Sequence, residues 1–308
     1  MSANRRVVCL CALLSLAAGG ASAQTPQQDV RVADLRAKLG RELNQIASTF
    51  DGAIGIAVRD LTTGEVLAVN ADTVFPQASS IKIAVLLEVL GQAQAGTLKL
   101  GERIEVKRAA MAPGSGVLQD FGDATSALAI RDLATLMIVL SDNSATNILI
   151  DRVGMAHVNE RLAALRLNQT RLERRMMDKE AERAGVENLS TPRDMTLLLD
   201  QLYHGKALDA AHTTLALDIL KIPKPEGTPL SRGLPAGLSL ADKKGELDGV
   251  RCDSGIVLLA GRPYAISVMT TYARDEEAAE RAISEVSRRV FAYFERLARS
   301  NAHGVRVQ

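Results

Sequence analysis

Hydrophobic spacing predicts long amphipathic helices near both ends of the chain. Between Val30 and Phe50, apolar residues recur every three or four positions, the period of a helix that buries one face. Asp275–Ala298 predicts a second long helix that closes the fold. After the first helix, the apolar run Ala53–Val58 predicts a buried strand, and Glu65–Val69 predicts its hairpin partner.

The middle of the chain predicts a helical block, followed by three more strands. Pro76–Leu90 begins with Pro and Ser and then stays apolar, which is typical of a fully buried helix. Five further helices are predicted, at Ile130–Leu140, Asn143–Val153, Ala156–Leu165, Pro192–Leu202 and Ala207–Ile219. A proline-rich loop at 221–235 precedes three strands, at Leu238–Lys243, Gly255–Leu259 and Tyr264–Thr271.

This order of elements predicts a layered α/β or α+β fold. A sheet interrupted by a helical insertion gives two lobes, because the strands on either side of the insertion must rejoin. We expect a sheet lobe at about 30–75 and 225–299, covered by the first and last helices, and a helical lobe at about 76–224. The two lobes would form one catalytic domain over 24–308, with the substrate cleft between them.

The first residues predict a secretory signal peptide, Met1–Ala23. Arg5 and Arg6 form a basic start, and the apolar stretch Val7–Ala18 is too short to span a bilayer. Ala21-Ser22-Ala23 has the small residues of a cleavage site. Because no later segment holds eighteen consecutive apolar residues, we expect a periplasmic or secreted protein without a stable membrane anchor.

Composition narrows the classes of function. The 308 residues carry 37 Lys and Arg against 36 Asp and Glu, and losing the signal peptide changes the net charge only from +1 to −1. Such a balance, with 3% aromatic residues and no Trp, argues against a nucleic-acid partner. Cleavage also leaves one of three cysteines, Cys252, so no intrachain disulfide is expected. The four His are scattered, so we expect no metal and no cofactor.

The first candidate site is Ser79-x-x-Lys82, at the start of a predicted buried helix. The i to i+3 spacing puts both side chains on one helix face. The helix N-terminus would stabilise an oxyanion formed at Ser79, and burial would lower the pKa of Lys82 until its amine accepts a proton. Taken alone, the pattern favours the structural interpretation, in which Ser79 is a cap and the stem of Lys82 lies along apolar surface.

Two further motifs follow at gaps of about sixty and about a hundred residues. Ser141-Asp142-Asn143 lies between two predicted helices, where it would cap the second one, or supply a proton relay from Ser141 and an orienting amide from Asn143. Lys243-Lys244-Gly245 would close a strand. There it is either a charged strand end or a cationic edge that attracts a substrate carboxylate, with the Gly allowing close approach.

Taken together, the three motifs resemble the Ser-x-x-Lys, Ser-Asp-Asn and Lys-Thr-Gly set of class A β-lactamases and penicillin-binding proteins. The resemblance extends to Phe75–Ala78, to Gly114–Leu118, which looks like the loop at the cleft edge, and to Ser144–Asn147. It covers about Val30–Ala298.

The resemblance implies a five-stranded antiparallel sheet, flanked by the N- and C-terminal helices, plus an all-helical lobe. It implies that Ser79 is acylated, with Lys82 as activating base or relay, Ser141 passing a proton to the leaving nitrogen, and Asn143 orienting Lys82 and the substrate. Backbone N–H groups of Ser79 and Glu246 would form the oxyanion hole. Substrates would be β-lactams or D-Ala-D-Ala-like peptides, and the protein would act as a monomer.

Two departures from the family pattern bear on turnover. Class A enzymes carry a Glu and an Asn on the loop below the nucleophile, and that Glu activates the deacylating water. After Thr170–Arg174 matches the start of the loop, the Glu position falls on Arg175 or Met176 and the Asn position on Lys179 or Glu180. The four acids at 173, 178, 180 and 182 are interpreted as solvated loop charges rather than as a relocated base.

The second departure is Lys244, which replaces the family's Thr or Ser. It brings charge without the compact hydroxyl that helps to hold the substrate carboxylate. We expect Asp248 and Asp253 to neutralise part of this charge, and Arg251 to be either a carboxylate anchor or a surface arginine. The sequence therefore predicts an exported serine hydrolase that opens β-lactams or related amides with slow deacylation. The alternatives are a DD-carboxypeptidase or esterase on the same residues, and a binder of β-lactams or cell-wall fragments without turnover.

Overall fold

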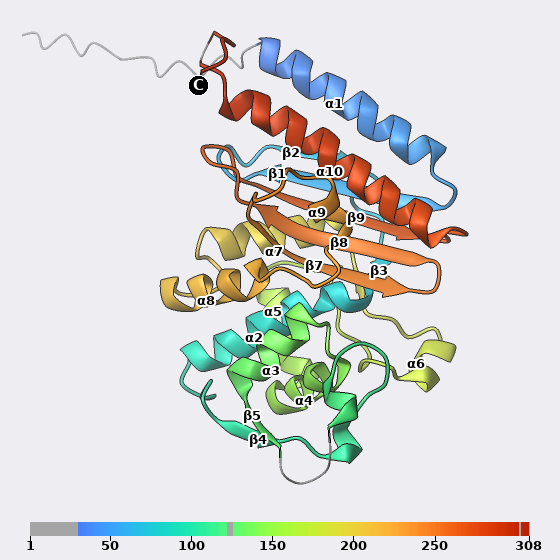
Figure 1. Cartoon of the computed structure of the whole chain (residues 1–308), viewed down its shortest axis with the longest axis vertical. Helices are drawn as coiled ribbons and strands as arrows, with labels where there is room; N and C mark the ends of the chain where they lie inside the picture. Colours follow the sequence, from blue (N-terminus) through green and yellow to red (C-terminus); the bar gives the residue numbers. More distant parts are fainter. Residues whose placement is uncertain (1–29, 122–125, 302, 308) are drawn as a thin grey trace, which may run out of the picture.

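A five-stranded antiparallel sheet forms the centre of one lobe in the computed structural model, which describes residues 30–121, 126–301 and 303–307 (Figure 1). The sheet order is β2-β1-β9-β8-β7. Its strands are β1 (Ala53–Asp60), β2 (Val66–Val69), β7 (Leu240–Leu247), β8 (Val250–Val257) and β9 (Tyr264–Thr271). This confirms the predicted fold class. The predicted signal peptide lies outside the described residues.

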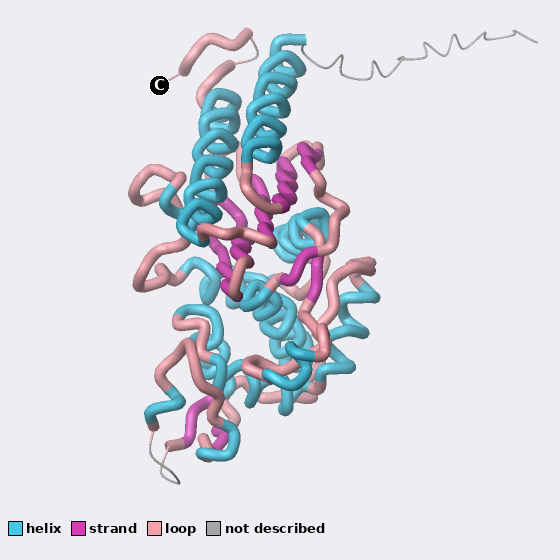
Figure 2. The backbone as a smooth tube through the Cα atoms, turned by 90° about the vertical axis from the view of Figure 1, so that its right-hand side faces the viewer, coloured by secondary structure: helices cyan, strands magenta, loops and turns pink. Residues whose placement is uncertain are grey.

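The two terminal helices cover one face of the sheet, as the amphipathic patterns predicted. Helix α1 (Val30–Thr49) and helix α10 (Glu276–Ala298) lie side by side across this face (Figures 1 and 2). Leu43 and Phe294 are among the buried side chains that they contribute, and the ring of Phe294 stacks on Tyr264 of β9 at 4.3 Å between centroids. Burial of these apolar side chains stabilises the layer at roughly 1.5–3 kcal/mol each.

The helical lobe packs against the opposite face of the sheet. Its central helix is α2 (Lys82–Gln94), in which every residue from 82 to 91 is buried. The helices around it are α3 (Ile130–Val139), α4 (Asn143–Val153), α5 (Met155–Ala164), α7 (Pro192–Tyr203) and α8 (Ala210–Lys221). Helix α7 packs on β1 and β9, while α2 is surrounded by α3, α4, α5 and α8. The lobes therefore meet where α2 begins.

Several short elements are not predicted by the sequence pattern, because each is too short to show a period. They are β3 (Phe75–Pro76) paired with β6 (Leu189–Ser190), β4 (Arg103–Glu105) paired with β5 (Ala127–Ala129), α6 (Lys179–Arg183), α9 (Pro229–Arg232) and three 3₁₀ turns. One of these turns, η1 (Ala78–Ile81), precedes α2 and carries Ser79.

The Lys243-Lys244-Gly245 motif lies within a strand rather than at its end, so the predicted boundary is wrong. β7 continues to Leu247, and β8 begins at Val250 rather than at Gly255. A hydrophobicity pattern does not detect this part of β7, because its residues are charged or polar. β7 is an edge strand, and these residues still pair with β8: Lys243 lies opposite Ser254 and Gly245 opposite Cys252.

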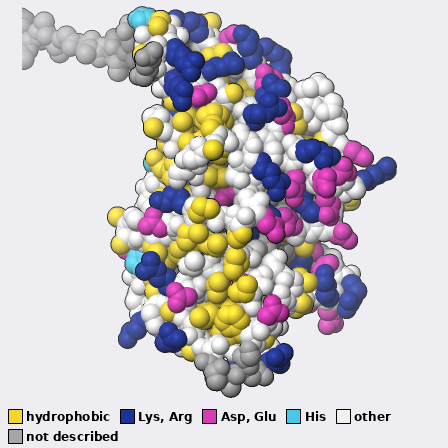
Figure 3. Space-filling model, in the orientation of Figure 1, with side chains coloured by type: hydrophobic (Ala, Val, Ile, Leu, Met, Phe, Trp, Pro, Cys, Tyr) yellow, Lys and Arg dark blue, Asp and Glu magenta, His cyan; other side chains and the backbone are white. Residues whose placement is uncertain are grey.

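Charges of both signs intermingle over the right-hand side of the face seen in Figure 3. Among the residues that the structure describes, no helix is long and apolar enough to cross a membrane. Cys252 is buried as a free thiol.

Candidate active site

Two cavities adjoin Ser79 where the lobes meet. The larger has a volume of about 350 Å³, and its lining includes Ser79, Ser141, Lys243 and Lys244. The smaller, of about 120 Å³, is lined by Ser79 and Asn143 together with the loop after Arg174. Glu246 lines both cavities. These two cavities bring together the residues of all three motifs.

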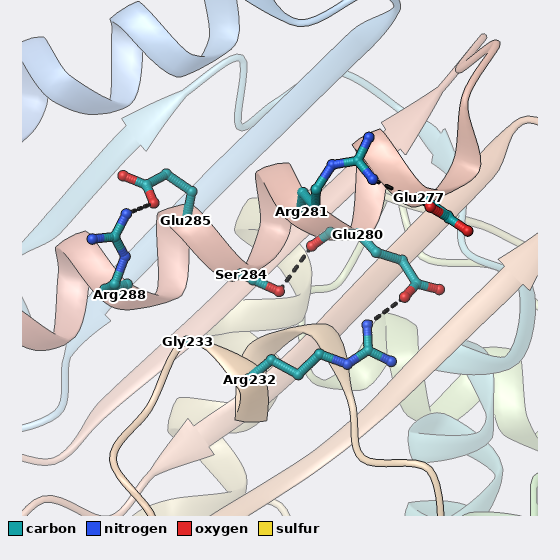
Figure 4. A pocket seen from close by; sticks show the side chains of 8 residues that line it. All are labelled: Arg232, Gly233, Glu277, Glu280, Arg281, Ser284, Glu285 and Arg288. Carbon is teal, nitrogen blue, oxygen red and sulfur yellow. Dashed lines mark hydrogen bonds and ion pairs between the residues drawn. The ribbon is translucent and has the colours of Figure 1, made fainter.

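A different hollow, of about 610 Å³, lies between α9 and α10 and contains none of these motifs (Figure 4). Its charges neutralise one another in the pairs Arg232–Glu280, Arg281–Glu277 and Arg288–Glu285. Because each cation there already has a carboxylate partner, this hollow offers no comparable set of reactive groups.

Ser79 lies on a strained turn that is pressed against β7. Ala78, directly before it, has φ +46°, a left-handed conformation that costs a non-glycine residue of order 1 kcal/mol. A Cβ on Gly245 would lie 2.5 Å from the Gln77 carbonyl oxygen and 3.0 Å from the Ser79 nitrogen. Only glycine therefore permits this approach, which brings the backbone of β7 beside Ser79.

Lys82 is fully buried and hydrogen-bonded by the second motif. Its Nζ donates to the Ser141 carbonyl oxygen at 2.7 Å, to Ser141 Oγ at 3.0 Å and to Asn143 Oδ1 at 3.0 Å. Burial holds the pKa of Lys82 well below its ordinary value, and the charge of Lys243 lowers the pKa further, against the opposing effect of Asp142. Burial and the charge of Lys243 thus make the protonated form of Lys82 easier to deprotonate, and a deprotonated Nζ would keep two of these bonds as a donor and accept the third from the Ser141 hydroxyl.

In the second motif Asp142 is the capping residue, while its neighbours Ser141 and Asn143 contact Lys82. Asp142 caps α4 by accepting from the Ala145 N–H at 2.8 Å, and its other oxygen accepts from the Val117 N–H at 2.7 Å. This fixes the cleft-edge loop, where a Cβ on Gly116 would lie 2.2 Å from Asp142 Oδ2. The neighbours of Asp142 are then free to contact Lys82.

The third motif places two lysines beside the larger cavity. Lys243 is buried, its Nζ donates to the Lys244 carbonyl oxygen at 2.7 Å, and burial lowers its pKa to about 7. Lys244 Nζ lies 2.8 Å from Glu246 Oε1 and 3.9 Å from Glu226 Oε2.

The acids expected to neutralise Lys244 do not contact it. Asp253 pairs with Lys244 across the strands, but its buried Oδ2 accepts from the Leu230 N–H at 3.0 Å. Asp248 is exposed beyond the end of β7. The paired acids are Glu246 and Glu226 instead, because Glu246 lies two residues along the same strand face and Glu226 lies on the facing loop.

Arg251 is not brought to either cavity lining. Its neighbour Cys252 points toward Pro76, where the thiol donates to the carbonyl oxygen at 3.3 Å. Because adjacent side chains of a strand point to opposite faces, Arg251 faces α10. There its guanidinium pairs with Glu276 and lies 3.5 Å from Glu280.

The loop beneath Ser79 places an apolar side chain at the smaller cavity. Asn147 holds the Met176 backbone from both sides, since its Nδ2 donates to the carbonyl oxygen at 3.1 Å and its Oδ1 accepts from the N–H at 2.8 Å. Met176 is 8% exposed and lines the cavity with Ser79. Arg175 points outward and pairs with Asp151 at 2.9 Å. Of the two sequence positions considered for the missing Glu, only Met176 lines the cavity.

The acids that do line this cavity are held by cations. Glu187 accepts from the buried Arg174 at 3.0 Å, and Glu182 accepts from Lys179 at 2.9 Å. The hydrogen bond from Lys179 lowers the pKa of Glu182 below its ordinary value, against a smaller effect of burial. A carboxylate with a lowered pKa is a weaker base, which argues against Glu182 as a replacement base.

The other acids of the loop lie outside the cavity lining: Glu173 pairs with Arg171, Asp178 caps α6, and Glu180 is exposed. The sequence analysis missed Glu187 and Glu226. Neither carries a local signal, because both act through ion pairs with residues distant in the sequence.

No group of three or more His, Cys, Asp or Glu suited to a metal occurs over 30–121, 126–301 and 303–307. The site therefore combines a serine at the cavities with a buried lysine three residues later, the residue types of a serine hydrolase that uses a lysine.

Comparison with known proteins identifies the family. A family model described as the β-lactamase enzyme family matches residues 38–294, so the chain belongs to this family and is a β-lactamase-like serine hydrolase. A β-lactamase from Sphaerobacter thermophilus is 30% identical, with a TM-score of 0.74 over 85% of this chain and 97% of that one. An ancestral class A β-lactamase is 28% identical, with a TM-score of 0.77 over 83% and 100%.

A mutant of PBP-A, solved as an acyl-enzyme complex with penicillin G, is 30% identical to this chain. Its TM-score is 0.75 over 85% of this chain and 97% of that one.

Proposed function

We propose that the protein is an exported enzyme that opens β-lactams or related amides through an acyl-enzyme at Ser79 and releases the acyl group slowly. The observation that carries the proposal is that Lys82, three residues after Ser79, is buried and hydrogen-bonded to Ser141, while the apolar Met176 lines a cavity with Ser79. The first group serves acylation. The second leaves the subsequent hydrolysis without its base.

In the proposed acylation, Lys82 takes the proton from Ser79 Oγ as that oxygen bonds to the carbonyl carbon of the substrate. The carbonyl oxygen becomes negatively charged and accepts hydrogen bonds from the backbone N–H groups of Ser79 and Glu246. When the tetrahedral intermediate collapses, the C–N bond breaks. The proton passes from Lys82 through Ser141 Oγ, 3.0 Å away, to the leaving nitrogen.

Hydrolysis of the acyl-enzyme needs a water that loses a proton as it attacks. A positioned general base contributes typically 10²–10⁴-fold to such a step. The side chain beneath Ser79 is a thioether, a weak acceptor that cannot take that proton at neutral pH. Slow deacylation follows from this substitution.

Met176 also supports a second candidate, a DD-carboxypeptidase or esterase that uses the same residues. In these reactions Ser79 Oγ also bonds to the carbonyl carbon, the C–N or C–O bond breaks, and the amine or alcohol leaving group diffuses away while the acyl part stays on Ser79. Release of D-Ala from a D-Ala-D-Ala peptide, or turnover of a simple ester faster than of any β-lactam, would select this candidate.

A stopped-flow experiment with a chromogenic cephalosporin tests the proposal. We expect a burst equal to the enzyme concentration and then slow turnover, because acylation outruns hydrolysis. Ser79→Ala should abolish the burst. Absence of both burst and turnover in the wild-type protein would refute the proposal.

A further inference from the structure

The cations that line the two cavities around Ser79 already have partners. Lys224 Nζ lies 2.7 Å from Asp242, Lys243 donates to a backbone carbonyl, and Lys244 lies 2.8 Å from Glu246. In the smaller cavity, Arg174 is paired with Glu187 and Lys179 with Glu182. Among the residues that the structure describes, each Lys or Arg of the two cavity linings therefore already has a partner. An incoming substrate carboxylate has to compete with that partner.

Lys244 is the cation for which that competition is most direct. Its side chain is 17% exposed and lines the larger cavity, whereas the side chains of Lys224 and Lys243 are nearly inaccessible. Its partner Glu246 is 41% exposed and belongs to both cavities. Burial would raise the pKa of Glu246, but the hydrogen bond from Lys244 and the nearby cations keep it below its ordinary value. Glu246 therefore stays ionised at neutral pH.

Glu226 adds a second negative charge on the facing loop, 3.9 Å from the same Nζ. Lys244 therefore faces two carboxylates, of which Glu246 is the nearer and Glu226 the more exposed. A free carboxylate that enters beside Ser79 must displace Glu246 from Lys244 and then lie close to two like charges.

We infer that the Glu246–Lys244 ion pair makes this cleft discriminate against substrates with a free carboxylate beside the reactive amide, and favour neutral acyl donors. The inference rests on the proposed acylation at Ser79, and it assigns Glu246 a role in specificity through its side chain. Loss of one charge-assisted hydrogen bond corresponds to about tenfold in rate or more.

The test compares one cephalosporin that bears its free carboxylate with the methyl ester of the same molecule. The measured quantity is the ratio of their acylation rate constants, acid over ester, determined in a single turnover with intact-mass detection of the Ser79 adduct. In Glu246→Gln the ratio should rise about tenfold over the wild-type ratio, because Lys244 is released to bind the carboxylate. The ester reports on any general loss of activity in the same variant.

Two further variants identify the cause of such a rise. In the double variant Lys244→Met/Glu246→Gln the ratio should fall back toward the wild-type value, because the released cation is gone. Asp248→Asn, which removes one negative charge just beyond the end of β7 and outside both cavity linings, should leave the ratio unchanged. A rise in Asp248→Asn as large as in Glu246→Gln would assign the effect to overall charge and overturn the inference.

The outcomes distinguish a failure of the inference from a failure of the proposed function. If both substrates acylate Ser79 and Glu246→Gln leaves their ratio unchanged, the inference fails while the proposed function stands. If the rise persists in the double variant, Lys244 is not the binding cation and the inference also fails. If neither substrate acylates wild-type Ser79, the proposed function fails and the inference falls with it.

Discussion

Replacing Met176 by Glu should convert slow release of the acyl group into turnover. Met176 lines the cavity beneath Ser79, and Asn147 holds its backbone on both sides, so a carboxylate at this position would be aimed at the acyl-enzyme. A general base of this kind is worth typically 10²–10⁴-fold, which corresponds to about 3–5 kcal/mol of the deacylation barrier. We therefore expect Met176→Glu to raise the deacylation rate constant by at least about a hundredfold.

The substitution carries a cost in stability, since Met176 is 8% exposed and a buried carboxyl group loses hydration. The backbone hydrogen bonds from Asn147 do not depend on the side chain and should remain. We expect a loss of roughly 1–3 kcal/mol in the free energy of unfolding, measured in urea.

The assay separates acylation from deacylation. Enzyme is acylated with a penicillin, excess drug is removed, and the decay of the adduct is followed by intact mass. Arg175→Glu is the matched control, because it adds the same side chain one residue earlier, where the chain points outward to Asp151. An adduct that decays no faster in Met176→Glu than in the wild-type protein, or equally fast in Arg175→Glu, would refute the assignment of Met176 to the missing base.

Two other predictions concern β7. Gly245→Val should reduce acylation by about a hundredfold or more, because the new side chain meets the Gln77 carbonyl oxygen and must push the strand away from Ser79; a variant that is folded by circular dichroism and acylates at the wild-type rate would contradict this. The second concerns Lys243, whose pKa is about 7 in the folded protein against 10.5 as its ordinary value. Between these values the unfolded chain binds more protons than the folded one, so stability rises with pH by up to about 1.4 kcal/mol per unit. Urea unfolding at pH 7, 8 and 9 should show a shallower rise in Lys243→Met, and equal slopes would refute the shifted pKa.

The parts of the fold with a clear period could be predicted from the sequence. The two terminal helices bury one face against the sheet, so their apolar residues recur every three or four positions. Strand β9 is buried along nearly its whole length and reads as an uninterrupted β-rich run. By contrast, the charged residues of β7 concealed its second half, because an edge strand at a cleft keeps polar side chains within the sheet.

The site could be predicted only as far as local motifs reach. Ser79, Lys82, Ser141 and Asn143 follow from patterns of three or four residues, and in the structure Lys82 Nζ contacts Ser141 and Asn143. Their catalytic roles stay predictions. The choice between Arg175 and Met176 needed the path of the loop, which Asn147 fixes from another helix. The position of the Arg251 side chain, and the identity of the acids that pair with Lys244, depend on which face of the sheet each side chain occupies. A shift of one residue along a strand reverses that face.

Intact-mass analysis of the wild-type protein exposed to penicillin tests the central claim most directly. The account predicts an adduct of one penicillin per chain that forms faster than it decays, maps to Ser79 by peptide digestion and persists long after free drug is removed. Absence of any adduct, with no hydrolysis of the drug, would contradict acylation at Ser79. Rapid loss of the adduct with catalytic hydrolysis would contradict slow deacylation.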